Sequence, residues 1–270
     1  MTHTLTLTKH HGLGNDFLVV FHPAVADADL PGLARRLCDR TRGIGADGLL
    51  VAGDADGMDA RMTLYNADGS VAEISGNGIR CFAQALASRR GSLEPQRILT
   101  GAGERLVTLS ATDDPTVIHA AVDMGEVLGI EAPGEWASIG ADPMRPVAHL
   151  SLGNPHTVVG VEDVRSVDLL ALGTKVPQVN LEIVEPGPEP HGITMRVHER
   201  GAGITEACGS GACASAWAAA QWGLAAPAVD EILVHMDGGA ARVRLHHPSA
   251  GRVTLIGPAQ YIATVVVEVP

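Results

Sequence analysis

The 270-residue chain has few aromatic and few basic side chains, which limits what it can bind. It has three Phe, three Trp and two Tyr, against 32 glycines. So few rings argue against a stacking platform for nucleic-acid bases. The 19 basic and 31 acidic residues give a formal net charge of −12. This charge argues against a surface for nucleic acid or an anionic membrane, and we expect neither as a partner.

Cysteine and long apolar runs are also scarce. The four cysteines, Cys38, Cys81, Cys208 and Cys213, form no CxxC pair, so we expect reduced thiols and a cytoplasmic protein. Nowhere do about 18 apolar residues follow one another, and the first residues lack a signal-peptide run, so neither export nor a membrane span is expected. The histidines have no carboxylate or thiol at ligand spacing, and no metal is expected.

Alternation of apolar and polar residues predicts many short strands with one central helix in each half of the chain. The first half has a further helix predicted at 29–40, and its central helix begins near Asn77, with Gly91 as its C-cap. Residues 212–223, ACASAWAAAQWG, are apolar almost all round, which is typical of a helix enclosed by strands. We predict an α+β fold with two pseudo-symmetric halves, each a curved, mostly antiparallel sheet or half-barrel around a central helix.

Two pairs of matching motifs indicate an internal duplication. SGNGIRCFAQALA and CGSGACASAWAAA share a small polar residue, a G-x-G turn and an Ala-rich helix. A Gly-Asn pair precedes each of them, in HGLGND and SLGNPH. The order is the same in both halves, and the boundary is expected near 112–116. The predicted domains are therefore residues 1–114 and 115–260.

The segment GIGADG, residues 43–48, fits the G-x-G-x-x-G pattern of dinucleotide-binding turns. Its context is the reverse of that fingerprint, because a polar helix precedes it and a strand follows it. We interpret it as a helix-to-strand turn. No cofactor is implied.

The two G-x-G helix starts are the candidate chemical site. Free backbone N–H groups and the positive end of the helix dipole bind a carboxylate there and lower the pKa of a thiol. Cys208 is thus a candidate base, although a small buried cysteine before a tight turn is the structural alternative. Two such helix ends facing each other would place one group on each side of an α-carbon. That arrangement is typical of a two-base racemase or epimerase without a cofactor.

The chain resembles the diaminopimelate epimerase family over nearly its whole length. The resemblance is carried by the motifs KHHGLGNDF, GIGADG, NADGS, GNGIRC, GNPH, VNLEIVE and HERGAGITEACGSGACAS. It implies interconversion of LL- and meso-diaminopimelate in lysine and cell-wall biosynthesis without pyridoxal phosphate. It also implies an active site between two domains, a last strand, about Tyr261 to Pro270, that returns to the first domain, and a homodimer.

The resemblance also implies a set of site residues. His156 and Glu199 are expected to poise the catalytic groups. Amides and backbone N–H groups can bind the carboxylates of a dipolar amino acid, Arg200 can pair with a carboxylate and Glu199 with an ammonium group. The expected substrate contacts are Asn15, Asn66, Gly76, Asn77, Asn154, Asn180, Glu199, Arg200, Gly209 and Ser210.

Two positions depart from the family pattern. Gly48 stands where some members have a glutamine that contacts substrate. Ser75 stands where the family has its second catalytic cysteine, and a hydroxyl is a far weaker acid than a thiol. Cys81 is an unsuitable substitute, since it lies about 9 Å further along the helix axis and on another face.

Three interpretations of Ser75 are open. It could be an engineered replacement of cysteine, a natural partner of Cys208 as in proline-racemase-like enzymes, or the mark of a protein that has lost epimerisation. We predict a diaminopimelate epimerase-like enzyme with Cys208 as one acid/base and Ser75 in the place of the other. The alternatives are an epimerase or racemase of another amino acid and a catalytically silent amino-acid-binding protein.

Overall fold

The computed structural model describes residues 3–21, 24–25, 29–225, 230–246 and 251–269. The chain forms two compact units, residues 1–122 together with 257–270, and residues 123–256. The two predicted domains, residues 1–114 and 115–260, remain a prediction.

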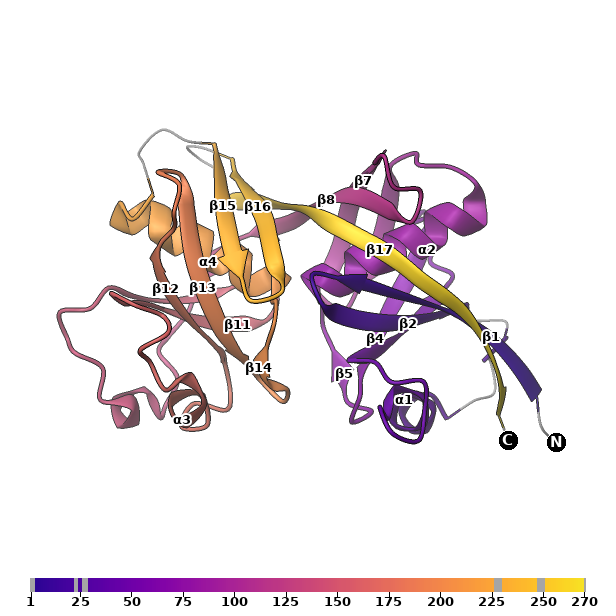
Figure 1. The fold of residues 1–270 in the computed structure, drawn as a ribbon, viewed down its shortest axis with the longest axis horizontal. Helices are drawn as coiled ribbons and strands as arrows, with labels where there is room; N and C mark the ends of the chain where they lie inside the picture. Colours follow the sequence, from indigo (N-terminus) through magenta and orange to yellow (C-terminus); the bar gives the residue numbers. More distant parts are fainter. Residues whose placement is uncertain (1–2, 22–23, 26–28, 226–229, 247–250, 270) are drawn as a thin grey trace. The chain divides into compact units, whose positions relative to one another are not determined.

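The first unit is a ring of strands around one helix (Figure 1). Pairing runs in the order β17, β1, β2, β3, β4, β6, β7, β8, and β8 pairs with β17. The pairs β2–β3 and β4–β6 are parallel and the other pairs with a described register are antiparallel. The strands are β1 (His3–Gly12), β2 (Asn15–Phe21), β3 (Gly48–Gly53), β4 (Ala60–Asn66), β5 (Val71–Ala72), β6 (Gln96–Thr100), β7 (Gly103–Ala111), β8 (Val117–Glu126) and β17 (Arg252–Val269).

Helix α2 (Gly76–Arg90) lies inside this ring, and every residue from Gly76 to Ala87 is buried. Gly91 ends the helix with a left-handed φ of 63°, a conformation that costs glycine little. The helix predicted from Asn77 and its cap at Gly91 are confirmed.

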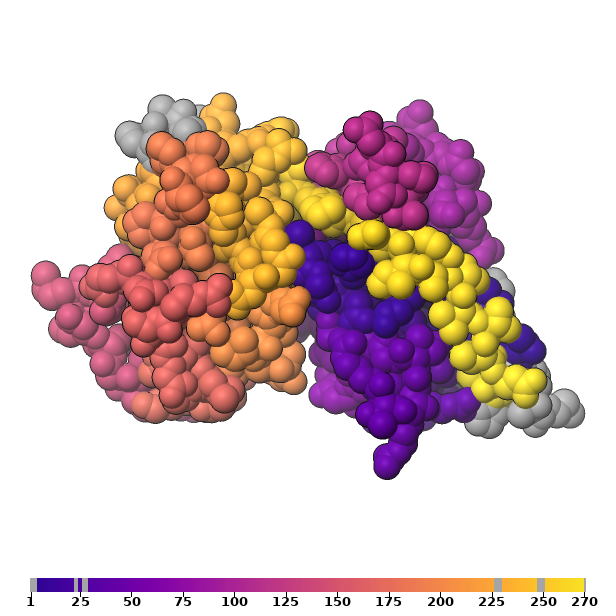
Figure 2. Space-filling view, in the orientation of Figure 1, coloured from indigo at the N-terminus to yellow at the C-terminus, as the bar shows by residue number. Residues whose placement is uncertain are grey.

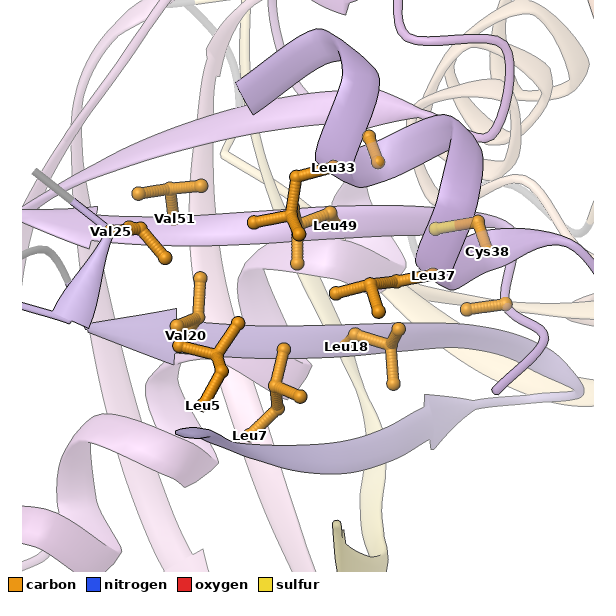
Figure 3. Packing of buried hydrophobic residues seen from close by; sticks show 12 residues of the cluster. Leu5, Leu7, Leu18, Val20, Val25, Leu33, Leu37, Cys38, Leu49 and Val51 are labelled. Atoms are coloured by element: carbon orange, nitrogen blue, oxygen red, sulfur yellow. The ribbon is translucent and has the colours of Figure 1, made fainter. Parts of the chain in front are cut away.

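Helix α1 (Leu30–Cys38) covers the outside of the sheet. Asp29 caps it by accepting a hydrogen bond from the N–H of Gly32. Leu33 and Leu37 then pack against leucines of β1 and β2 (Figure 3). GIGADG follows this helix and leads into β3, so the predicted helix-to-strand turn is confirmed.

The second unit repeats this topology. Pairing runs in the order β9, β10, β11, β12, β13, β15, β16, β17, with β11–β12 and β13–β15 parallel. The sequence of parallel and antiparallel pairs is the same as in the first unit, so the duplication is confirmed at the level of the fold. The strands are β9 (Leu128–Gly129), β10 (Val147–Ser151), β11 (Pro155–Gly160), β12 (Asn180–Pro186), β13 (Gly192–Glu199), β14 (Gly203–Thr205), β15 (Glu231–Met236) and β16 (Gly239–Leu245).

Helix α4 (Gly209–Trp222) takes the place of α2 in the second unit. It is buried almost all round, and its apolar sequence, predicted to be enclosed, is explained by contacts with β10 to β13, β15 and β16. It begins at Gly209 with Cys208 as its cap, so the predicted helix start at the G-x-G turn before the apolar segment 212–223 is confirmed. A short helix α3 (Leu169–Gly173) was not predicted from the sequence. It packs with β11 and β12, as α1 packs with β2 and β3 in the first unit. A 3₁₀ turn, η2 (Trp136–Ile139), precedes β10.

The last strand is longer than expected. The sequence predicted a strand from about Tyr261, and β17 begins at Arg252. Its residues from Gly257 onward belong to the first unit, and this end of the chain is drawn in yellow in Figure 2. In the described part of the chain, no helix is long and apolar enough to cross a membrane.

Candidate functional site

The two predicted catalytic side chains cap the two central helices in the same way. Cys208 has extended backbone angles, φ −125° and ψ 113°, and its Sγ accepts a hydrogen bond of 3.3 Å from the N–H of Gly211. Ser75, with φ −131° and ψ 125°, accepts one of 3.0 Å at Oγ from the N–H of Gly78. Each group thus sits at the positive end of a helix, where a developing negative charge is stabilised.

In the first unit, amide side chains link the start of α2 to the start of β2. The Nδ2 of Asn77 donates to Oδ1 of Asn15 at 3.2 Å, and Nδ2 of Asn15 donates to Asp47 at 2.7 Å. The Oδ1 of Asn77 accepts a hydrogen bond of 2.7 Å from Arg80, a fully buried arginine. Asn15, Asn77 and the Ser75 position therefore lie together within this unit.

A charged cluster holds the Asp47 that orients Asn15. Arg40 contacts both Asp16 and Asp47 at 2.7 Å, and Lys9 contacts Asp16 at 2.8 Å. Burial raises the pKa of Asp16, but the hydrogen bonds from Arg40 and Lys9 outweigh it, so the pKa is lowered. The carboxylate thus stays ionised and fixes the β2 start.

Asn66 and Gly48 are partners across β3 and β4. The Nδ2 of Asn66 donates to Oγ of Ser70 at 3.0 Å. A Cβ at position 48 would lie 2.8 Å from the carbonyl oxygen of Tyr65 and 3.3 Å from the ring of Phe17. A glutamine at Gly48 would therefore require the backbone of β4 to shift.

In the second unit, hydrogen bonds run from the start of α4 into the sheet. The Nδ2 of Asn154 donates to Oγ of Ser210 at 3.2 Å, which links the same two positions as the bond from Asn77 to Asn15 in the first unit but with the direction reversed. The Oγ of Ser210 lies 3.7 Å from Sγ of Cys208. His156 is fully buried, and its Nε2 lies 3.0 Å from Oδ1 of Asn154.

The other predicted residues of this unit cluster at the ends of β12 and β13. The Nδ2 of Asn180 donates to the carbonyl of Pro155 at 3.2 Å, and its Oδ1 accepts from the backbone N–H of Arg200 at 2.8 Å. Glu199 accepts a short hydrogen bond of 2.5 Å from Thr205. Gly76 and Gly209 occupy equivalent places as the first residues of α2 and α4.

The predicted lowering of the Cys208 pKa is wrong for this structure. Burial raises the pKa of the thiol well above its usual range, and negative charge on the nearby Glu199, or on Glu182 where that residue is ionised, raises it further. The N–H of Gly211 and the hydroxyl of Ser210 act in the opposite direction but are outweighed. The helix end alone therefore does not make Cys208 a thiolate.

Glu182 is a further residue of this site that was not predicted from the sequence. This residue lies in the middle of β12, between Leu181 and Ile183, and is fully buried. Its Oε1 is 2.7 Å from Nδ1 of His156. An acidic residue at the centre of an otherwise apolar run was the available signal, because a buried carboxyl group requires a partner.

A cavity of about 930 Å³ in the first unit contains none of the predicted residues. Its lining includes His10, Gln84 and Tyr261, near the middle and the C-terminal half of α2. Within the described ranges, no cluster of three or more metal-ligating side chains occurs.

Sequence comparison connects this geometry to a family. The profile described as diaminopimelate epimerase matches residues 7–129 and 149–262, which contain every predicted site residue. The chain belongs to the diaminopimelate epimerase family. It is similar to the diaminopimelate epimerase of Desulfitobacterium hafniense, 37% identical over 280 residues and 96% of each chain. It is 35% identical to the one of Halothermothrix orenii, again over 96% of each chain.

Solved structures share the fold of this diaminopimelate epimerase family member at low identity. A phenazine biosynthesis protein of the PhzF family from Bacillus anthracis has a TM-score of 0.75, 14% identity and 99% coverage of both chains. A hydroxyproline epimerase from Agrobacterium vitis with bound trans-4-hydroxy-L-proline has a TM-score of 0.69 and 14% identity, covering 98% of this chain and 91% of that one. These likenesses establish the α+β fold.

Proposed function

We propose that this chain is an amino-acid epimerase that interconverts LL- and meso-diaminopimelate without a cofactor. Cys208 is one proton-transferring residue, and Ser75 occupies the place of the other. The observation that carries the proposal is the pair of equivalent helix caps, in which Sγ of Cys208 and Oγ of Ser75 each accept a backbone N–H bond at a helix N-terminus.

The chemistry requires a base on one face of the α-carbon and an acid on the other. The raised pKa keeps the Cys208 thiol protonated, so it has a proton to donate, and the donors from Gly211 and Ser210 stabilise the thiolate that proton abstraction requires. Substrate recognition falls to the remaining predicted residues. The side-chain amides of Asn15, Asn66, Asn77, Asn154 and Asn180 suit carboxylates and ammonium groups, as do Glu199 and Arg200.

Ser75 sets the limit on the rate. Among the described residues, no histidine or carboxylate is hydrogen-bonded to its Oγ, so the hydroxyl has no local base to activate it. Proton abstraction is therefore expected largely on the Cys208 face. His156 and Glu199 are proposed to poise the reacting groups of the site.

The test is nuclear magnetic resonance of LL- and meso-diaminopimelate, incubated separately with the protein in heavy water. Deuteration at the α-carbon with inversion would support a working pair of Ser75 and Cys208. Exchange of one isomer without inversion would mean that Cys208 works and Ser75 does not.

Two outcomes would contradict the proposed function. Binding of diaminopimelate with no exchange for either isomer would indicate a silent binding protein. Inversion of another amino acid, such as hydroxyproline, with no exchange of diaminopimelate would indicate a different substrate. Cys208→Ala is the matched control, because any exchange that survives it does not come from this thiol.

We also propose a homodimer in the cytoplasm, on the basis of the family resemblance. Light scattering coupled to gel filtration tests the first statement, since a single peak of monomer mass at working concentration would contradict it. Fractionation of cells that produce the protein tests the second.

A further inference from the structure

A continuous series of hydrogen-bonding groups connects Glu182 to Cys208 within the second unit. Oε1 of Glu182 lies 2.7 Å from Nδ1 of His156, and Nε2 of His156 lies 3.0 Å from Oδ1 of Asn154. The Nδ2 of Asn154 then donates to Ser210, whose Oγ lies 3.7 Å from Sγ of Cys208. Glu182, His156 and Ser210 are buried, and Asn154 between them is half-buried.

The donors and acceptors in this series limit where the protons can lie. Oδ1 of Asn154 is an acceptor, so Nε2 of His156 carries a hydrogen and donates it. Two arrangements then satisfy the contact of 2.7 Å between Nδ1 and Oε1: a charged ring donating to a carboxylate, or a neutral ring accepting from a protonated Glu182. Because Oγ of Ser210 accepts a hydrogen bond from Asn154, its own hydrogen can be directed at Sγ of Cys208.

The surroundings of Glu182 favour its neutral form. Its second oxygen, Oε2, is buried and has no hydrogen-bond partner among the described residues, which costs more free energy for a carboxylate than for a carboxylic acid. The titratable groups that face it are His156 from β11, Glu199 from β13 and Cys208 from α4. Burial raises the pKa of Glu182, and the charge of Glu199 adds to this, whereas His156 lowers it.

The equivalent positions of the first unit lack such a pair. The register of β11 with β12 sets His156 opposite Asn180, and the register of β2 with β3 sets Phe17 opposite Gly48. Phe17 follows the Gly14-Asn15 pair as His156 follows Gly153-Asn154, and Leu50 then corresponds to Glu182. The buried acid is thus built under Cys208 and not under Ser75.

The position of Glu182 relative to the helix supports a role at Cys208. A Cβ added to Gly211 would lie 2.6 Å from Oε1 of Glu182 and 3.2 Å from Sγ of Cys208. The carboxyl group is thus packed beneath the same turn whose N–H caps the thiol. Only glycine at this position leaves room for both.

We propose that Glu182 is a positioning residue that holds a proton and, through His156, Asn154 and Ser210, directs a hydroxyl hydrogen at Sγ of Cys208. Glu182 does not touch the reacting atoms. Its proton fixes the tautomer of His156, the tautomer fixes the orientation of the Asn154 amide, and the amide leaves the Ser210 hydroxyl free to donate to the thiolate. This inference rests on the proposed function of Cys208, but its test does not require turnover.

The first test is nitrogen-15 magnetic resonance of the histidine rings in the unmodified protein at neutral pH, with His156→Gln to assign the signals. The expected result is a neutral ring of His156 that carries hydrogen on Nε2. A doubly protonated ring, or hydrogen on Nδ1 alone, would overturn the proposal.

The second test compares Glu182→Gln with Glu182→Leu, the residue found at the equivalent position of the first unit. Glutamine can donate to Nδ1 and so mimics the neutral acid, whereas leucine cannot. We expect leucine to slow iodoacetamide alkylation of Cys208 about tenfold at fixed pH, which corresponds to one pKa unit of the thiol. Glutamine should restore both the alkylation rate and the His156 spectrum.

Cys208→Ser supplies the background from the other three thiols. Equal alkylation in the leucine variant and the unmodified protein, at whatever rate, would overturn the link to Cys208. A glutamine variant as slow as the leucine variant would show that a charged carboxylate is needed and would overturn the neutral form. If the His156 spectra and the alkylation rates are as expected but diaminopimelate does not exchange, the proposed function is contradicted and the role of Glu182 is not.

Discussion

At the scale of single residues, Ser75 and Cys208 show that one backbone position can hold groups of very different acidity. Both cap a helix and accept one N–H bond three residues along, so the local geometry does not distinguish them. The difference lies in the side-chain atom and in its surroundings. Cys208 is buried near Glu182 and Glu199, whereas Gly78 beside Ser75 has the ring of Phe17 as a neighbour.

Replacing Ser75 with cysteine is expected to raise the rate of diaminopimelate inversion. A positioned acid or base is worth typically ~10²–10⁴-fold, and a thiol provides one where a hydroxyl does not. The measurement is inversion in heavy water with Ser75→Cys against the unmodified protein. Ser75→Ala is the control for side-chain loss, and unchanged kinetics in the cysteine variant would refute the role of this position.

Adding one carbon at Gly211 is expected to disrupt the Cys208 half of the site. The new Cβ would lie 2.6 Å from Oε1 of Glu182, closer than van der Waals contact allows, and the carboxyl group is held by His156. We expect Gly211→Ala to slow α-deuteration about tenfold or more, as for a misplaced catalytic group. Gly134→Ala is the control, because no atom lies within 4 Å of its added Cβ.

At the scale of elements, a buried arginine connects the central helix of the first unit to its last strand. Arg80 donates to the carbonyls of Gly76 and Pro258 at 3.2 and 3.1 Å, and to Asn77 at 2.7 Å. Pro258 belongs to β17, far along the chain from α2. A single side chain therefore satisfies acceptors from the helix and the strand that returns to it.

Arg80→Met is expected to lower the free energy of unfolding by about 2 kcal/mol or more, because buried acceptors lose their donor. Urea unfolding measures this effect. Arg89→Met on the same helix is the matched control. Arg89 lies 4.3 Å from the ring of Phe21 at the surface, an interaction worth about 0.5–1 kcal/mol. Equal losses in the two variants would contradict the buried role of Arg80.

At the scale of the whole molecule, buried thiols make stability depend on alkaline pH. Burial raises the pKa of Cys38 and of Cys81 from 9.0 to about 12. Between these values the unfolded chain loses the thiol proton while the folded chain keeps it. Stability contributed by each protonated thiol is therefore present below pH 9 and is lost as the pH rises toward 12.

The expected slope is a loss of about 1.4 kcal/mol per pH unit for each such thiol. Urea unfolding at several pH values above 9 measures it. Cys81→Ala should reduce this slope by the contribution of one thiol. The contribution of Cys38 should be unchanged and serves as an internal control. A slope identical in the variant and the unmodified protein would contradict the raised pKa of Cys81.

Much of the fold could be predicted from the sequence, because its signals are local. Alternation marks the strands, while the glycine after α2 and the G-x-G turns mark helix ends. The motif pairs around Ser75 and Cys208 likewise predicted two equivalent halves, and the strand pairing bears this out. The short helix α3 was missed because five residues carry no periodicity that distinguishes a helix from a turn.

The sequence by itself determined the two helix starts, the residue type at each and the family, since these depend on neighbouring residues and on motifs. Only the tertiary structure decided how those groups behave. Burial reversed the expected pKa shift of Cys208, because a helix end contributes only a partial charge, whereas desolvation of the buried thiol is the largest effect. The tertiary structure also placed Glu182 beneath the same helix turn, because the register between β11 and β12 sets which side chain of β12 faces His156.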